Sequence, residues 1–141
     1  MLQRTDAADA IDPLMRPFFE RSGLAALRLG GRALLPIVQG GMGVGVSAHK
    51  LAGNVASLGG VGTISSVDLR RHHPDLMERT QGLASRPGMD ADTKAVIDAA
   101  NLEAIGREIR AARVLSEGRG LLAINVMRAV AEYAASVKKA L

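Results

Sequence analysis

The chain has 141 residues, of which 48% are hydrophobic and 23% charged. This composition excludes a wholly disordered chain and provides the core of one domain or of part of a larger one. The net charge of +4 is small, and aromatic residues make up only 2%, so nucleic-acid binding is not indicated. Because the sequence has no cysteine, disulfides, thiol catalysis and cysteine-bound metals are excluded.

The N-terminus carries Asp6, Asp9 and Asp12 and lacks the apolar run of a signal peptide. No apolar stretch approaches the roughly 18 residues that a membrane-spanning helix needs. These features predict a soluble, cytoplasmic protein.

Residues 1–31 are predicted to be an N-terminal extension, separate from a domain over 32–141. Pro13 and Pro17 interrupt the extension, which favours short helical turns. We expect three apolar side chains of these turns to pack on the domain: Leu14, Phe18 and Phe19.

A regular pattern begins at Ala33. The apolar run over 33–38 predicts a buried strand, although Pro36 inside it is unfavourable for a central strand. A glycine-rich loop follows over 39–46, and then a helix over 48–58, for which Ser47 is the expected N-cap. The buried face of this helix is expected to carry Leu51, Val55 and Leu58, and residues 61–65 predict a second strand.

The second half of the domain repeats the order. A long connection over 66–92, with a helical turn near 76–79, leads to an amphipathic helix over 93–116. A third apolar strand is predicted over 121–126 and a helix over 128–141, with one apolar face formed by Val130, Ala134, Val137 and Leu141.

Alternation of strand and helix is typical of a parallel sheet with right-handed crossovers. A closed (β/α)8 barrel takes about 250 residues. The predicted fold class is therefore α/β: the first three β/α units of a (β/α)8 barrel, incomplete at the C-terminus.

Two polar features and the long loop after the second strand are predicted to meet at the C-terminal ends of the strands, where ligands bind in such sheets. One is the loop with Gly40, Gly41, Gly43 and Gly45, whose spacing fits neither the G-x-G-x-x-G fingerprint nor the P-loop. The other is Asn125, a polar residue within an apolar strand. Each has a structural alternative: a tight turn for the loop, and a strand-end cap for the asparagine.

The remaining charged residues indicate no site. Asp68 and His72 would share a helical face, but a solvated loop is the better interpretation than a metal site. Exposed positions are predicted for His49, His73, Arg70 and Arg71 and, on the long helix, for Asp98, Glu103, Arg107 and Glu108.

Two motifs resemble the nitronate monooxygenases, formerly called 2-nitropropane dioxygenases. The first is Pro36-Ile37-Val38-Gln39-Gly40-Gly41-Met42-Gly43 with the helix and turn that follow, including Ser47, Leu51-Ala52, Val55-Ala56 and Gly59-Gly60-Val61-Gly62. The second is Ala123-Ile124-Asn125-Val126-Met127, similar to a Gly-Val-Asn-Ile-Met stretch of the family. The resemblance covers about residues 34–137.

This resemblance implies an FMN-containing (β/α)8 barrel that oxidises alkyl nitronates with O₂ to carbonyl compounds and nitrite. Gly40, Gly41 and Met42 would lie against the flavin, and Asn125 would hydrogen-bond it. FMN-dependent enoyl-acyl-carrier-protein reductases, which use NAD(P)H, share the fold and the opening motif and are the alternative.

The family's catalytic histidine belongs to a Gly-Gly-His motif, which is absent from these 141 residues. No catalytic residue and no metal ligand is therefore assigned. The expected partners are a nitronate and O₂, with a homo-oligomer as a further possibility. The chain by itself is expected to bind flavin weakly and to be inactive, and a non-catalytic binding module is the third hypothesis.

Overall fold

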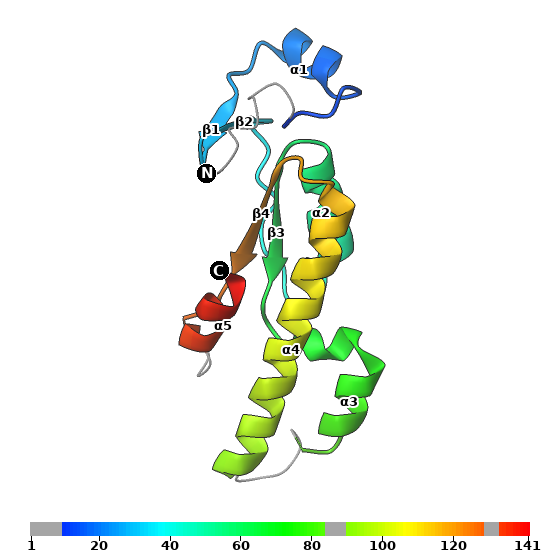
Figure 1. Ribbon diagram of the computed structural model, residues 1–141, viewed down its shortest axis with the longest axis vertical. Helices are drawn as coiled ribbons and strands as arrows, with labels where there is room; N and C mark the ends of the chain where they lie inside the picture. The colour runs from blue at the N-terminus through cyan, green and yellow to red at the C-terminus, as the bar shows by residue number, and fades with distance from the viewer. Residues whose placement is uncertain (1–9, 84–89, 129–132) are drawn as a thin grey trace, which may run out of the picture.

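A computed structural model describes residues 10–83, 90–128 and 133–141, which form a mixed α/β structure (Figure 1). In these ranges the helices and strands follow one another along the chain as α1 (Arg16–Ser22), β1 (Leu27–Leu29), β2 (Arg32–Leu34), α2 (His49–Ser57), β3 (Val61–Ser65), the 3₁₀ helix η1 (Leu69–His72), α3 (Pro74–Thr80), α4 (Ala91–Ser116), β4 (Leu121–Asn125) and α5 (Tyr133–Ala140). None of the helices within the described ranges is both long and apolar enough to cross a membrane.

The centre of the structure is the parallel pair β3 and β4. The pair runs in register from Val61 opposite Leu121 to Ser65 opposite Asn125. β3 is buried along its whole length, and each of the two strands ends in a polar residue. The predictions of strands near 61–65 and 121–126 and of their parallel pairing are confirmed.

The predicted strand over 33–38 is wrong in its extent. Its first residues belong to β2, which pairs antiparallel with β1, and only Val38 reaches the parallel sheet, through a single bridge to Val61. Pro36 lies between the two parts and has no N–H to donate to a ladder, so it separates the hairpin from the sheet. The β1–β2 hairpin also lies across the predicted boundary at residue 31.

The N-terminal part packs differently from the prediction. Phe18 is 61% and Leu14 77% exposed, so neither packs on the domain as predicted, whereas Phe19 is half-buried. The hairpin is held instead by a small apolar cluster in which Ala10, Leu34 and Val61 are buried. Figure 1 shows this hairpin at the end of the sheet where β3 and β4 begin.

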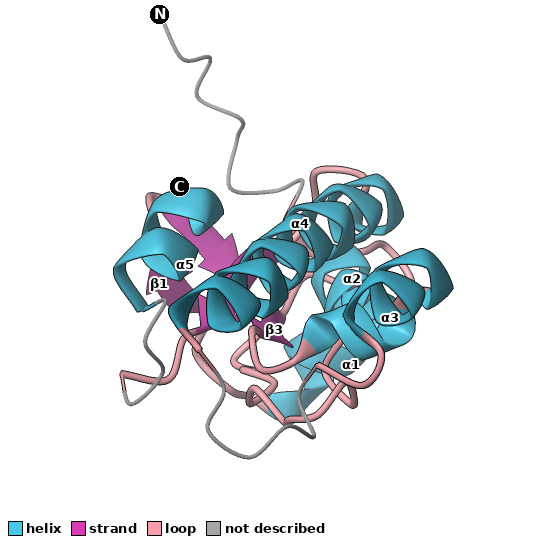
Figure 2. Ribbon diagram, turned by 90° about the horizontal axis from the view of Figure 1, so that it is seen from below, coloured by secondary structure: helices cyan, strands magenta, loops and turns pink. Residues whose placement is uncertain are grey.

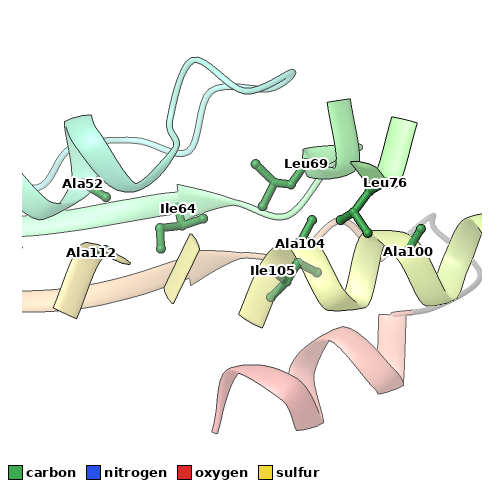
Figure 3. Packing of buried hydrophobic residues seen from close by; sticks show 8 residues of the cluster. All are labelled: Ala52, Ile64, Leu69, Leu76, Ala100, Ala104, Ile105 and Ala112. Carbon is green, nitrogen blue, oxygen red and sulfur yellow. The ribbon is translucent and has the colours of Figure 1, made fainter. Parts of the chain in front are cut away.

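Helices α2 and α4 cover one side of the parallel strands, and the view from below shows α5 beside β4 and α4 (Figures 1 and 2). The main core lies between these helices, β3 and η1, and its buried side chains are Ala52, Ile64, Leu69, Leu76, Ala100, Ala104, Ile105 and Ala112 (Figure 3). Half of these are alanine, so the helix backbones approach each other closely.

The prediction for the buried face of α2 is wrong, because the close approach of α4 selects small residues on that face. The buried residues of this helix are Ala52, Gly53 and Ala56, whereas Leu58 is 40% exposed. A Cβ on Gly53 would lie 2.7 Å from Leu115 Cβ, which shows how closely α4 approaches. Small residues, not the large ones, therefore mark the face that packs.

Helix α4 agrees with the prediction for residues 93–116 and begins two residues earlier. Asp90 is its N-cap and accepts a hydrogen bond of 2.7 Å from the backbone N–H of Thr93. The predicted C-terminal helix corresponds to α5. Its predicted apolar face is wrong, because Ala134 and Leu141 are exposed and the buried residue of α5 is Ser136; Val130 lies outside the described residues.

An exposed ion cluster joins α3 to α4. The Arg107 guanidinium donates two hydrogen bonds to Asp75, of 2.8 and 2.7 Å, and one of 2.6 Å to Glu103. The hydrogen bond from Arg107 lowers the pKa of Asp75 from its ordinary value of 3.8 to about 2. Hydrogen bonds from Arg107 and Arg79 also lower the pKa of Glu103, and the two carboxylates raise the pKa of Arg107.

This cluster predicts a pH dependence of stability in acid. Since the pKa of Asp75 is depressed in the folded state, its contribution is present above about pH 4 and is lost as the pH falls through about 2. We expect Arg107→Gln to lose less stability than the parent chain between these two pH values. Urea-unfolding midpoints at each pH measure the difference, and equal losses in both proteins would refute this assignment.

Candidate functional site

The buried hydroxyl of Ser47 holds the glycine-rich loop in place. This hydroxyl accepts a hydrogen bond of 2.9 Å from the Met42 backbone N–H and donates one of 3.1 Å to the Gly40 carbonyl. The prediction that Ser47 caps the following helix is wrong. The N-cap residue of α2 is Ala48, whose side chain makes no capping hydrogen bond. Ser47 is committed to the loop before the helix begins.

Gln39 ties the start of the loop to the sheet. Its Nε2 donates a hydrogen bond of 2.8 Å to Ser47 Oγ, and its Oε1 accepts one of 2.9 Å from the Thr63 backbone N–H. The backbone N–H of Ser65 also donates to the Ser47 carbonyl, at 2.9 Å. These bonds hold the loop at the C-terminal end of β3.

Asn125 meets the same loop from β4. Its Nδ2 donates a hydrogen bond of 3.3 Å to the Gly41 carbonyl. The backbone carbonyl of Asn125 accepts one of 3.0 Å from the Ser66 N–H. A Cβ on Gly41 would lie 2.5 Å from the Asn125 Cβ, so only glycine fits here. The structure thus brings the loop and Asn125 together, as the sequence predicts.

The surface of the loop is open. A Cβ on Gly40 would meet nothing within 4 Å, and the side chain of Met42 is 46% exposed. Asn125 is exposed as well. Among the four residues predicted to contact a cofactor, Gly41 has no room for a side chain. The other three, Gly40, Met42 and Asn125, have accessible surface.

A second polar cluster lies next to this loop, and the sequence prediction missed it. Glu108 was expected on a solvated face of α4, yet it is only 2% exposed. Its Oε2 accepts hydrogen bonds of 2.7 Å from both the backbone N–H and Nδ1 of His49, which places the half-buried His49 against α4 rather than in solvent.

His73 approaches the other oxygen of the same carboxylate. Its Nε2 lies 3.1 Å from Glu108 Oε1, an ion-pair contact whose angle is outside that of a hydrogen bond. The signal for this cluster was in the sequence: Glu108 lies four residues after Ala104 and four before Ala112, on the stripe that packs in the core.

The prediction of an exposed position is also wrong for Arg70. Arg70 is 4% exposed, and its guanidinium contacts Asp68 Oδ1 at 2.8 Å and donates to Thr80 Oγ1 at 2.9 Å. Asp68 forms ion pairs with both Arg70 and Arg71. In the described parts of the chain, no group of three or more histidine or acidic residues is arranged to hold a metal ion.

The geometry defines an α/β protein with a glycine loop and an asparagine at the C-terminal ends of parallel strands. Comparisons of the chain with protein-family models, with curated proteins and with solved structures found no match in any of the three.

Proposed function

We propose that this chain supplies the first three β/α units of an FMN-dependent nitronate monooxygenase, with Gly40, Gly41, Met42 and Asn125 against the flavin. The observation that carries the proposal is the hydrogen bond from Asn125 Nδ2 to the Gly41 carbonyl. It joins the two motifs of the resemblance, which are 84 residues apart in the sequence, at the ligand-binding end of the strands.

The residues present fit a flat, partly apolar ring system. The open backbone at Gly40 allows close approach of a ring, and the accessible thioether of Met42 offers an apolar, polarizable contact. The hydrogen bond to Gly41 uses the Nδ2 of Asn125, so its Oδ1 remains to accept a hydrogen bond from the ring edge.

When bound, FMN supplies the electron transfer from the nitronate to O₂. In this proposal the residues of the chain bind and orient: Ser47 and Gln39 fix the loop, and Asn125 fixes both the loop and the ring. No catalytic role is given to His49 or His73, because both contact the buried Glu108.

Asn125→Ala is the variant that tests the flavin contact. In protein made from the complete reading frame that contains these residues, we expect the affinity for FMN to fall about tenfold, the equivalent of about 1.4 kcal/mol for one lost hydrogen bond. Fluorescence titration with FMN measures the change. Asn54→Ala is the matched control, since Asn54 is exposed on α2 and its side chain donates a hydrogen bond to the Lys50 carbonyl of its own helix.

Equal FMN affinities for Asn125→Ala and the parent would contradict the placement of the flavin. The same protein distinguishes the two chemistries: nitrite release from a nitronate supports the proposal, and NAD(P)H-dependent enoyl reduction without nitrite release supports the enoyl reductase instead. A protein that binds no flavin and self-associates through its exposed sheet edge, where Val38 is 62% exposed, would favour a binding module.

A further inference from the structure

A cavity of about 510 Å³ lies beside the glycine loop, between the start of α2, the end of η1 and α4. Its volume is in the range of about 300–1,000 Å³ that small-molecule sites occupy. Its wall carries one acidic side chain, Glu108, and four basic ones, namely His49, Lys50, His72 and His73. The cavity is therefore basic in spite of the buried carboxylate.

The carboxylate of Glu108 is already engaged. Its Oε2 accepts two hydrogen bonds from His49, and its Oε1 faces Nε2 of His73 at 3.1 Å. Each of these two rings turns one nitrogen toward Glu108, and the other nitrogen has no hydrogen-bond partner among the residues that the structure describes. The carboxylate thus orients two imidazoles whose second nitrogens remain to bind a ligand.

The third histidine closes the cavity on the side of the loop. A Cβ on Gly45 would lie 1.5 Å from His72 Nε2, so the ring stands directly against the loop backbone. The neighbouring charges face elsewhere, since Arg107 binds Asp75, and Arg70 and Arg71 bind Asp68. The titratable groups that face the cavity are His49 and Lys50 from α2, His72 and His73 from the end of η1, and Glu108 from α4.

From this arrangement we infer that the cavity binds a small molecule bearing a phosphate or carboxylate group. Lys50 supplies an ammonium group, and hydrogen bonds from a charged donor to such an anion are the strong ones. The imidazole nitrogens that do not face Glu108 supply further hydrogen-bonding positions on the same wall.

The test is an NMR titration of the 141-residue chain with inorganic phosphate and, separately, with succinate, at constant ionic strength. We expect saturable shifts of the imidazole C–H signals of His49, His72 and His73 with at least one of the two anions. The anion that binds more tightly identifies the group that the site recognises.

One variant and its control locate the site. Lys50→Gln is expected to weaken binding about fivefold, because it removes the positive charge that Lys50 brings to the cavity. Lys138→Gln is the control, because Lys138 is exposed on α5. Unsaturable shifts, equal shifts with chloride, unchanged affinity in Lys50→Gln, or saturation of these rings by Zn²⁺ but by neither anion would each overturn the inference.

Discussion

Glu108→Ala is expected to lower the free energy of unfolding by about 3 kcal/mol. The carboxylate connects three separate parts of the fold, because it sits on α4 and contacts the first turn of α2 and the N-cap residue of α3. Its removal leaves the backbone N–H and Nδ1 of His49 without an acceptor. It also opens a cavity beside Ala104 and Ala112 in the core.

Urea unfolding followed by circular dichroism measures this loss. Glu78→Ala is the matched control, since Glu78 is an exposed glutamate on α3, and we expect it to change the free energy by less than about 0.5 kcal/mol. If Glu108→Ala were as stable as this control, the buried carboxylate would have no role in holding α2, α3 and α4 together.

Gly62→Ala is expected to be at least as damaging, with a loss of about 3 kcal/mol or no folded protein. A Cβ at this position of β3 would lie 1.8 Å from the Ala52 carbonyl oxygen and 2.6 Å from its carbonyl carbon. Both are backbone atoms of α2, so no side-chain rotation can relieve the overlap. The helix would have to move away from the sheet and lose its packing in the core.

Gly40→Ala gives the comparison for Gly62→Ala, because a Cβ on Gly40 would meet nothing within 4 Å. We expect its unfolding midpoint to stay close to that of the parent, within about 0.5 kcal/mol. A Gly62→Ala protein as stable as Gly40→Ala would show that α2 does not pack on β3 as closely as described.

The sheet and the long helix were predictable because their patterns are local. The short segments at 61–65 and 121–126 lack the alternation of a half-exposed strand, which indicates cover on both faces, and the stripe along α4 marks the buried side of that helix. The meeting of Gly41 with Asn125 was also predictable, because residues at the same end of parallel strands lie together.

What could not be predicted depends on close approach between elements distant in sequence. The buried face of α2 consists of Ala52, Gly53 and Ala56, and small side chains carry little hydrophobic signal even where they define the packing. Glu108 looks like one more charge on a charged helix until Ala104 and Ala112 are recognised as its neighbours on the buried stripe. Its partners come from segments 59 and 35 residues away, which no periodicity links to it.

Pro36 shows a third kind of difference. The run over 33–38 is apolar throughout, but the proline divides it between an antiparallel hairpin and a single parallel bridge at Val38. Hydrophobicity predicted burial of the whole run, but only Leu34 and Leu35 are buried, whereas Ile37 is 50% and Val38 62% exposed. Backbone hydrogen bonding decided the pairing of the run. The pairing matters for the site, because the glycine loop begins directly after Val38.

We propose that the glycine loop and Asn125 form one side of a flavin site. The absorbance spectrum of protein purified from the complete reading frame that contains this chain, with the bound flavin identified after release, tests this proposal. We expect FMN near one equivalent, reduced in Asn125→Ala and unchanged in Asn54→Ala. A protein without flavin, and with no affinity for added FMN, would contradict it.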